Sequence, residues 1–281
     1  MRTRIPASVH SPLEKLVLNT TQSTLALTLL LAAGATMAQD KSPEPDFSVT
    51  YNIGAVSDYR VRGISQTDFR PAVQGGIDFA HKSGFYLGTF ASNVNWVKDF
   101  NGATKGNIEV DLYGGFKDAI TSDISFDTGV IRYQYPSNNS GASGTPGAGL
   151  FANASTTEVY LMLTYKMVNL KYNRSVGNFL GNLASSGSQY FDLNATFDLG
   201  NSFALTPHVG RQKIPNQGAG GNLGDYTDYS LALAKDFGNG FVVTLTALDT
   251  NTKKGAGNFY HDFGDRDLGK STATVGVKYS F

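Results

Sequence analysis

The chain has 281 residues, no cysteine, and 23 basic side chains balanced by 23 acidic ones. A net charge of zero argues against a nucleic-acid partner, and the lack of cysteine excludes disulfide scaffolds, thiolate metal sites and cysteine nucleophiles. The 32 glycines, 18 phenylalanines and 14 tyrosines beside a single tryptophan are unusual for a soluble enzyme. They are typical of a β-barrel with a polar interior and aromatic rims.

The amino-terminal segment has the pattern of a secretory signal peptide. Basic residues precede an apolar run from Leu25 to Ala33, and small residues continue to Ala38. The run is too short to cross a bilayer as a helix, which needs about 20 residues. We therefore expect residues 1–38 to be a cleaved export signal, residues 39–46 a periplasmic leader, and residues 47–281 a single barrel in the outer membrane.

Side chains of alternating character recur along the rest of the chain. Apolar residues from Phe47 to Ala55 alternate with polar or small ones, which predicts the first strand. One further run follows the turn at Met167–Asn169. The other runs begin at Val73, Phe85, Ile108, Ile124, Val159, Phe191, Phe203, Tyr229, Phe241 and Ser271. The chain is thus predicted to be all-β, with about 12 strands.

Long polar or glycine-rich stretches alternate with short turns between these strands. The long stretches are Asn95–Gly106, Pro136–Asn153, Asn178–Gly187, Pro215–Gly224 and Thr250–Lys270. A soluble β-sandwich also has alternating strands. Long-short alternation with aromatic residues beside the turns favours a transmembrane antiparallel β-barrel with short periplasmic turns and long extracellular loops.

The last strand ends the chain on an aromatic residue. From Ala273 to Phe281 the apolar side chains share one parity, and no residues follow that could cover them. Outer-membrane lipid could cover this face. The segment resembles the closing strand of bacterial outer-membrane barrels. That resemblance implies that the strand ending in Phe281 is recognised by the barrel-assembly machinery.

Four segments carry a more specific resemblance. They are Ser57–Thr67 (SDYRVRGISQT), Pro71–Asp78 (PAVQGGID), Gly84–Val94 (GFYLGTFASNV) and Glu109–Gly115 (EVDLYGG). Together they closely resemble the proteobacterial TorF family of porins, with Val61 where that family usually has Phe. The resemblance covers the first third of the exported chain. It implies an outer-membrane barrel with a transport role in a Gram-negative bacterium, and no defined substrate or catalytic residue.

Charged residues fall on the strand parity opposite to the apolar one. An Arg or Lys on the lipid side at mid-depth would cost about 2 to 4 kcal/mol, so these side chains are expected to point inward. If the first strand continues beyond residue 56, its charged residues also point inward. The residues expected to line the lumen are Asp58, Arg60, Arg62, Asp78, Glu109, Asp111, Asp127, Glu158, Lys171, Asp192, His208 and Lys278.

The signs of these charges are unevenly distributed. Arg60, Arg62 and Lys278 belong to the first and last predicted strands, which are neighbours in a closed barrel, whereas most acidic residues belong to strands four to eight. Lys171 is the exception. A basic wall opposite an acidic wall would favour polar solutes over apolar ones. Alternatively, the charges form structural ion pairs that plug a narrow barrel.

An outer-membrane lipid hydrolase is the rival class of function. It would need a Ser and a His on the outer surface, next to lipid. His81 falls in a predicted turn, His208 points inward and His261 lies in a loop. We therefore expect no catalytic residue and no enzyme.

Metal and cofactor sites are not indicated either. His261, Asp262, Asp265 and Asp267 could offer ligands to Ca²⁺, but their spacing matches no ligand template. The glycine-rich loops are not followed by a helix or a Lys-Ser/Thr pair, so no phosphate cradle is expected. The sequence predicts a passive channel for small polar solutes. The alternative is a closed barrel whose loops have a structural or surface-interaction role.

Overall fold

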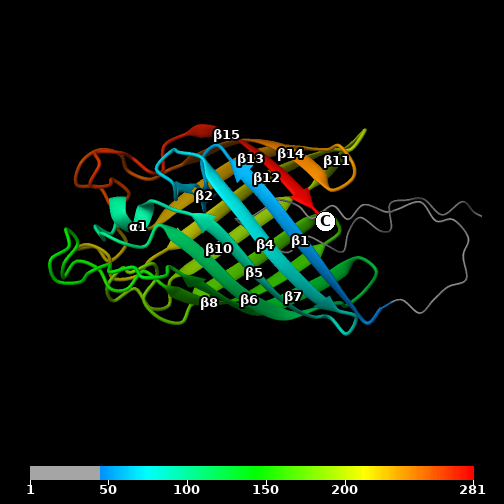
Figure 1. Ribbon diagram of the computed structural model, residues 1–281, viewed down its shortest axis with the longest axis horizontal. Helices are drawn as coiled ribbons and strands as arrows, with labels where there is room; N and C mark the ends of the chain where they lie inside the picture. Colours follow the sequence, from blue (N-terminus) through cyan, green and yellow to red (C-terminus); the bar gives the residue numbers. More distant parts are fainter. Residues whose placement is uncertain (1–44) are drawn as a thin grey trace, which may run out of the picture.

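Strands with two different faces make up most of the described chain, which comprises residues 45–281 of a computed structural model (Figure 1). The predicted signal peptide, residues 1–38, lies outside the described residues. So does the predicted leader, except for residues 45 and 46.

The strands pair with their neighbours in one antiparallel sheet that closes on itself. β10 and β11 both pair with β12 and are separated by Thr196 alone, so the 13 strands of the sheet form 12 barrel strands. This confirms the predicted all-β barrel. The strands are β1 (Phe47–Val56), β4 (Ala72–His81), β5 (Phe85–Asn93), β6 (Ile108–Ala119), β7 (Ile124–Gln134), β8 (Thr156–Tyr165), β9 (Val168–Ser175), β10 (Gln189–Ala195), β11 (Phe197–Gly200), β12 (Phe203–Lys213), β13 (Tyr226–Asp236), β14 (Phe241–Thr250) and β15 (Thr272–Ser280).

Each barrel strand has an exposed apolar face and a buried, largely polar face. In β8, Val159, Leu161 and Leu163 are exposed, whereas Tyr160 and Met162 between them are buried, as is Glu158 before them. This follows from the two-residue period of a strand, which sends successive side chains to opposite faces. The barrel is therefore apolar outside and charged inside.

The connections differ in length at the two ends of the barrel. Short turns join β4 to β5, β6 to β7, β8 to β9, β11 to β12 and β13 to β14, and the chain ends on the same side (Figure 1). Long connections lie at the other end, over residues 94–107, 135–155, 176–188, 214–225 and 251–271, close to the predicted ranges. One of them contains the four-residue helix α1 (Trp96–Asp99). Between residues 45 and 281 no helix is long and apolar enough to cross a membrane.

The expectation that the first strand continues through Asp58, Arg60 and Arg62 is wrong. β1 ends at Val56, and β2 (Arg60–Val61) pairs with β3 (Ile64–Ser65) in a separate two-stranded sheet. The physical reason is the turn between β2 and β3, where Arg62 and Gly63 have φ angles of 51° and 77°. Two successive residues with positive φ are characteristic of a tight type I′ hairpin turn. We call residues 57–71 the inner hairpin.

The barrel closes where β1 meets β15. Ile53 pairs with Tyr279, and Tyr51 and Phe281 exchange two backbone hydrogen bonds of 2.9 Å each. The Phe281 ring stacks on the rings of Tyr51 and Tyr279, with centroid distances of 5.8 and 5.7 Å. The first and last strands are thus neighbours, as the sequence predicted.

Replacing Phe281 with Ala should weaken this closure. The substitution removes two ring contacts, each worth about 0.5–1.5 kcal/mol, and leaves the backbone hydrogen bonds intact. We expect the free energy of unfolding in urea, measured on detergent-refolded protein, to fall by about 1–3 kcal/mol. Phe263→Ala, at an exposed ring in a loop at the opposite end, is the control. Equal losses in the two variants would contradict the role of the ring contacts.

Candidate functional site in the barrel interior

The inner hairpin folds into the barrel and contacts strands far apart around its wall. The Tyr59 hydroxyl donates a hydrogen bond to Glu109 of β6 over 2.7 Å. Arg62 donates to Glu158 of β8 over 2.6 Å and to Gln212 of β12 over 2.8 Å. β6, β8 and β12 are not adjacent in the sheet, so the inner hairpin reaches across the lumen.

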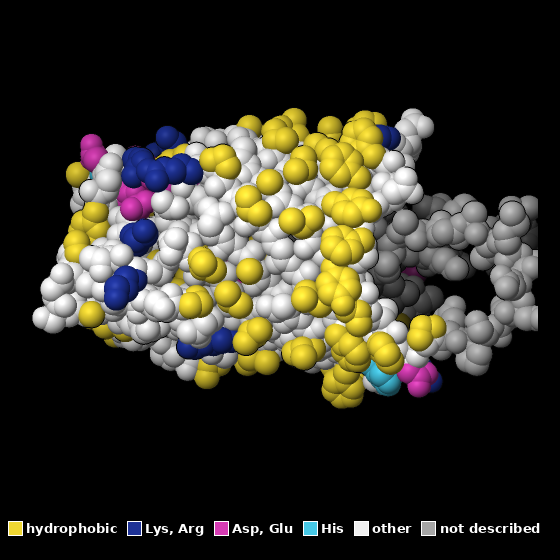
Figure 2. All heavy atoms as spheres, viewed as in Figure 1, with side chains coloured by type: hydrophobic (Ala, Val, Ile, Leu, Met, Phe, Trp, Pro, Cys, Tyr) yellow, Lys and Arg dark blue, Asp and Glu magenta, His cyan; other side chains and the backbone are white. Residues whose placement is uncertain are grey.

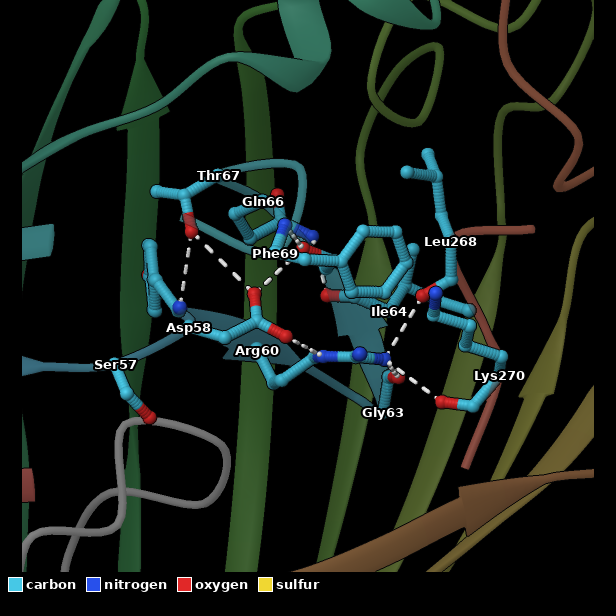
Figure 3. Close-up of polar contacts among 12 residues, drawn as sticks. Ser57, Asp58, Arg60, Gly63, Ile64, Gln66, Thr67, Phe69, Leu268 and Lys270 are labelled. Carbon is cyan, nitrogen blue, oxygen red and sulfur yellow. Dashed lines mark hydrogen bonds and ion pairs between the residues drawn. The ribbon is translucent and has the colours of Figure 1, made fainter. Parts of the chain in front are cut away.

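The base of the inner hairpin is held by an ion pair (Figure 3). Asp58 accepts hydrogen bonds of 2.6 Å from Arg60 Nε and from Ser65 Oγ. Arg60 Nη1 also donates to the Leu268 carbonyl over 2.9 Å and to the Lys270 carbonyl over 3.3 Å. These contacts join the inner hairpin to the loop between β14 and β15, which lies over the same end of the barrel.

The tip of the inner hairpin packs directly against β13 and β14 of the barrel wall. A Cβ placed on Gly63 would lie 2.6 Å from Thr250 Cγ2 and 2.9 Å from Asp228 Cβ. Tyr226 of β13 donates a hydrogen bond of 2.8 Å to the Arg62 carbonyl. Only glycine combines this close approach with a positive φ at little cost.

The residues predicted to line the lumen fall into two groups. Asp58, Arg60 and Arg62 lie on the inner hairpin. The others lie on barrel strands, with buried or half-buried side chains on the face opposite to the apolar one. They are Asp78, Glu109, Asp111, Asp127, Glu158, Lys171, Asp192, His208 and Lys278.

Many of these charges are paired with close neighbours. His208 lies between two carboxylates, with Nδ1 3.0 Å from Asp192 and Nε2 2.8 Å from Asp228. Lys171 is the register partner of Asp192, and its ammonium lies 4.1 Å from the centroid of the Tyr160 ring. The expected separation of a basic wall from an acidic wall is therefore wrong for Arg62 and Glu158, which are in direct contact, because the inner hairpin carries the guanidinium across the lumen.

Several buried polar residues of this interior were missed from the sequence. Asp228 has the inward parity of β13, but the predicted strand began only at Tyr229. Gln212 was missed because the predicted strand stopped at Val209, whereas β12 continues to Lys213. Longer strand boundaries would have found both. Tyr59 gives no such signal, since its contact with Glu109 exists only because the inner hairpin turns inward.

The other two histidines of the described chain lie outside the interior. His81, the last residue of β4, lies 2.7 Å from Ser83 Oγ and is half-buried. His261 lies 2.9 Å from both Asp265 and Asp267 in the loop between β14 and β15. In residues 45–281 no group of three or more His, Cys, Asp or Glu side chains is placed to hold a metal ion.

The Arg62 side chain lines two small cavities. The larger, of about 50 Å³, is lined by Arg62 and by side chains that are mostly aromatic or aliphatic, including Trp96, Phe179 and Tyr226. The smaller, of about 10 Å³, is lined by Arg62, Phe179 and Glu109 among others. The inner hairpin therefore leaves space next to its own guanidinium.

Gly63→Ala should loosen the inner hairpin. An alanine at positive φ costs about 1–2 kcal/mol, and its methyl group would also collide with Thr250 and Asp228. We expect the backbone amide of Ser65, in the inner hairpin, to exchange its hydrogen faster than in the unaltered protein. Gly238→Ala is a matched control, because Gly238 has a φ of 82° and no atom within 4 Å of its added Cβ. If both variants leave Ser65 equally protected, the packing of the tip is not what holds the hairpin.

The stability of the loop between β14 and β15 should depend on pH. The hydrogen bond that His261 donates to Asp267, with a second to Asp265, raises the pKa of His261, and the contact with His261 lowers the pKa of Asp267. The His261 contribution to stability is present below the ordinary pKa and is lost as the pH rises through the raised pKa. The Asp267 contribution is lost as the pH falls through the lowered pKa. The loop is held best between these limits.

An NMR titration of the His261 ring tests this expectation. Its midpoint should lie above about 6.5 in the unaltered protein and fall in Asp267→Asn, but not in the remote variant Asp118→Asn at the end of β6. An unchanged midpoint in Asp267→Asn would contradict the assigned partner.

The solved structure of the KdgM porin agrees with the barrel architecture. The KdgM porin is 10% identical, with a TM-score of 0.50 over 83% of this chain and 98% of that chain. An outer membrane channel from Pseudomonas putida F1 is also 10% identical, with a TM-score of 0.49 over 88% of this chain and 99% of that chain. No curated protein sequence matches. Residues 39–281 match a family described as a bacterial protein of unknown function (Gcw_chp), and the chain belongs to that family.

Proposed function

We propose that this chain is a porin-like channel of a Gram-negative outer membrane, through which small polar solutes diffuse passively. The observation that supports this proposal is the difference between the two faces of the closed barrel. Apolar side chains are exposed on the outside, and charged side chains are buried inside. A closed sheet leaves no unpaired edge, so it satisfies the backbone in lipid. Lipid is the partner of the outer face, and small polar solutes are the partners of the inner one.

The outer surface supports a membrane setting. Hydrophobic side chains are spread over the barrel wall, with a band of large ones towards the short-turn end, whereas basic and acidic side chains gather at the long-loop end (Figure 2). Exposed aromatic side chains lie on strands beside the short-turn end, as in the interfacial girdle of outer-membrane barrels. They include Phe47, Phe79, Phe85 and Phe281. The short turns are then periplasmic and the long loops extracellular.

Two finer assignments belong to this proposal. The segments from Ser57 to Gly115 that resemble the TorF porins support placing the chain in that group. The terminal strand ending in Phe281 supports recognition by the barrel-assembly machinery, since its aromatic end lies at the closing seam.

The inner hairpin is proposed to be the constriction of this channel. It crosses the lumen and is held at its base by Arg60 and at its tip by Arg62. The same contacts favour a second candidate, a permanently closed barrel whose loops serve a structural or surface role. The two candidates differ in whether solutes pass through the unaltered barrel.

Removing the inner hairpin should increase solute passage. Val56 and Ala72 are register partners, so a two-residue Asn-Gly turn can replace residues 57–71 while β1 and β4 stay paired. We expect proteoliposomes containing this variant to swell in small sugars and amino acids at least about tenfold faster than those with the unaltered protein, because the obstruction is gone.

The matched control deletes Ala219 and Gly220, two exposed residues of the loop between β12 and β13. It should swell like the unaltered protein. Correctly folded, unaltered barrels that show no solute-dependent swelling would contradict the channel and favour the closed barrel.

A further inference from the structure

The Arg62 side chain is bound within the barrel as a ligand would be. Its Nη2 donates to Glu158 Oε2 over 2.6 Å and its Nη1 to Gln212 Oε1 over 2.8 Å. The guanidinium carbon lies 4.4 Å from the centroid of the Tyr190 ring and 5.3 Å from that of Phe179. The planar guanidinium group donates hydrogen bonds to two acceptors, and two aromatic rings lie against its positive charge. This combination of contacts is specific for a guanidinium group. We call these four residues the guanidinium cage.

The cage belongs to the barrel and not to the inner hairpin. Glu158 lies on β8, Tyr190 on β10 and Gln212 on β12, whereas Phe179 lies in the loop between β9 and β10. The three strand residues make further contacts with the wall. Asn173 Nδ2 donates to Glu158 over 3.3 Å, and Gln212 Nε2 donates to the Gln189 carbonyl over 3.0 Å. The cage should therefore keep its shape when Arg62 leaves.

More carboxylates are buried around the cage than Arg62 itself binds. Both carboxylate oxygens of Asp111 and Oε1 of Glu158 are buried without a hydrogen-bond partner, and both residues have 0% exposure. Glu109 is also buried nearby, bonded to Tyr59 and Tyr135. Buried carboxylate oxygens without donors are costly, so this region favours additional cationic or donor groups. Of the two cavities beside Arg62, the smaller is lined by Glu109, and the larger has a mostly apolar lining.

We propose that the guanidinium cage is a binding site for small solutes that bear a guanidinium group, and that Arg62 is a tethered occupant of this site. The inference rests on the proposed function, because such a solute must enter the barrel. A tethered group acts at an effective concentration of the order of millimolar. A free solute therefore binds when it reaches a similar concentration or when the tip of the inner hairpin withdraws.

Guanidinium rescue of the Arg62→Ala variant tests the site. Removing one partner of a buried ion pair leaves Glu158 uncompensated, which should lower the Tm by roughly 10 °C. We expect guanidinium chloride at about 10 mM to restore most of this loss, since it supplies the missing cation to a cage that is otherwise intact. Urea has a similar shape but no charge, and methylammonium has a charge but no planar set of N–H donors. Both should restore much less of the lost Tm than guanidinium does.

The control is Arg132→Ala, which removes an arginine on the exposed face of β7. Guanidinium should leave its Tm unchanged. If Arg62→Ala folds only in the presence of an added cation, its refolding yield with guanidinium, methylammonium and urea replaces the Tm as the readout. Equal effects of guanidinium and urea on Arg62→Ala by either readout would overturn the site.

Electrical recording across planar bilayers separates the site from the channel. In Arg62→Ala, guanidinium should reduce the potassium current at concentrations about tenfold lower than methylammonium does. If neutral solutes pass through the barrel but guanidinium changes neither the current nor the Tm, the proposed site is wrong and the proposed channel is still supported. Rescue of the Tm in a barrel that conducts nothing would support the site and contradict the channel.

Discussion

The pairing of every strand with two neighbours is the constraint on which this structure depends. Once β1 pairs with β15, the sheet has no free edge, and each strand must present one face outward and the other inward. The two-residue period then sorts the sequence, with leucine, valine and phenylalanine on one side and charged residues on the other. Closure therefore creates both the apolar surface and the buried charges that any solute would meet.

Burying many charges in a ring of 12 strands has an energetic consequence. Each carboxylate that leaves bulk water needs a donor, and the interior provides these through tyrosine hydroxyls, amides and a few cations. His208 between Asp192 and Asp228 is one such arrangement, and Tyr59 and Tyr135 on Glu109 form another. Removing one partner of such a pair costs more than the pair contributes, so the interior tolerates conservative replacement better than deletion.

The inner hairpin is stabilised mainly at its two ends. Its base is joined to the loop between β14 and β15, and its tip is joined to the wall through Arg62. Tyr59, between them, adds the bond to Glu109. Because the guanidinium cage is built from the wall, the inner hairpin and a solute carrying the same chemical group would compete for one place. Such competition would make the constriction selective without requiring a large movement of the barrel itself.

The sequence by itself determined the class of the fold, the number of strands, the alternation of short and long connections and the facing of residues such as Glu109 and Lys171. These properties depend on local periodicity, which the strand geometry preserves. The course of residues 57–71 and the contact of Arg62 with Glu158 were decided only by the tertiary structure. A hairpin and a continued strand show the same alternation of side chains, so the sequence pattern does not distinguish them. The partner of Arg62 is Glu158, which lies 96 residues further along the chain.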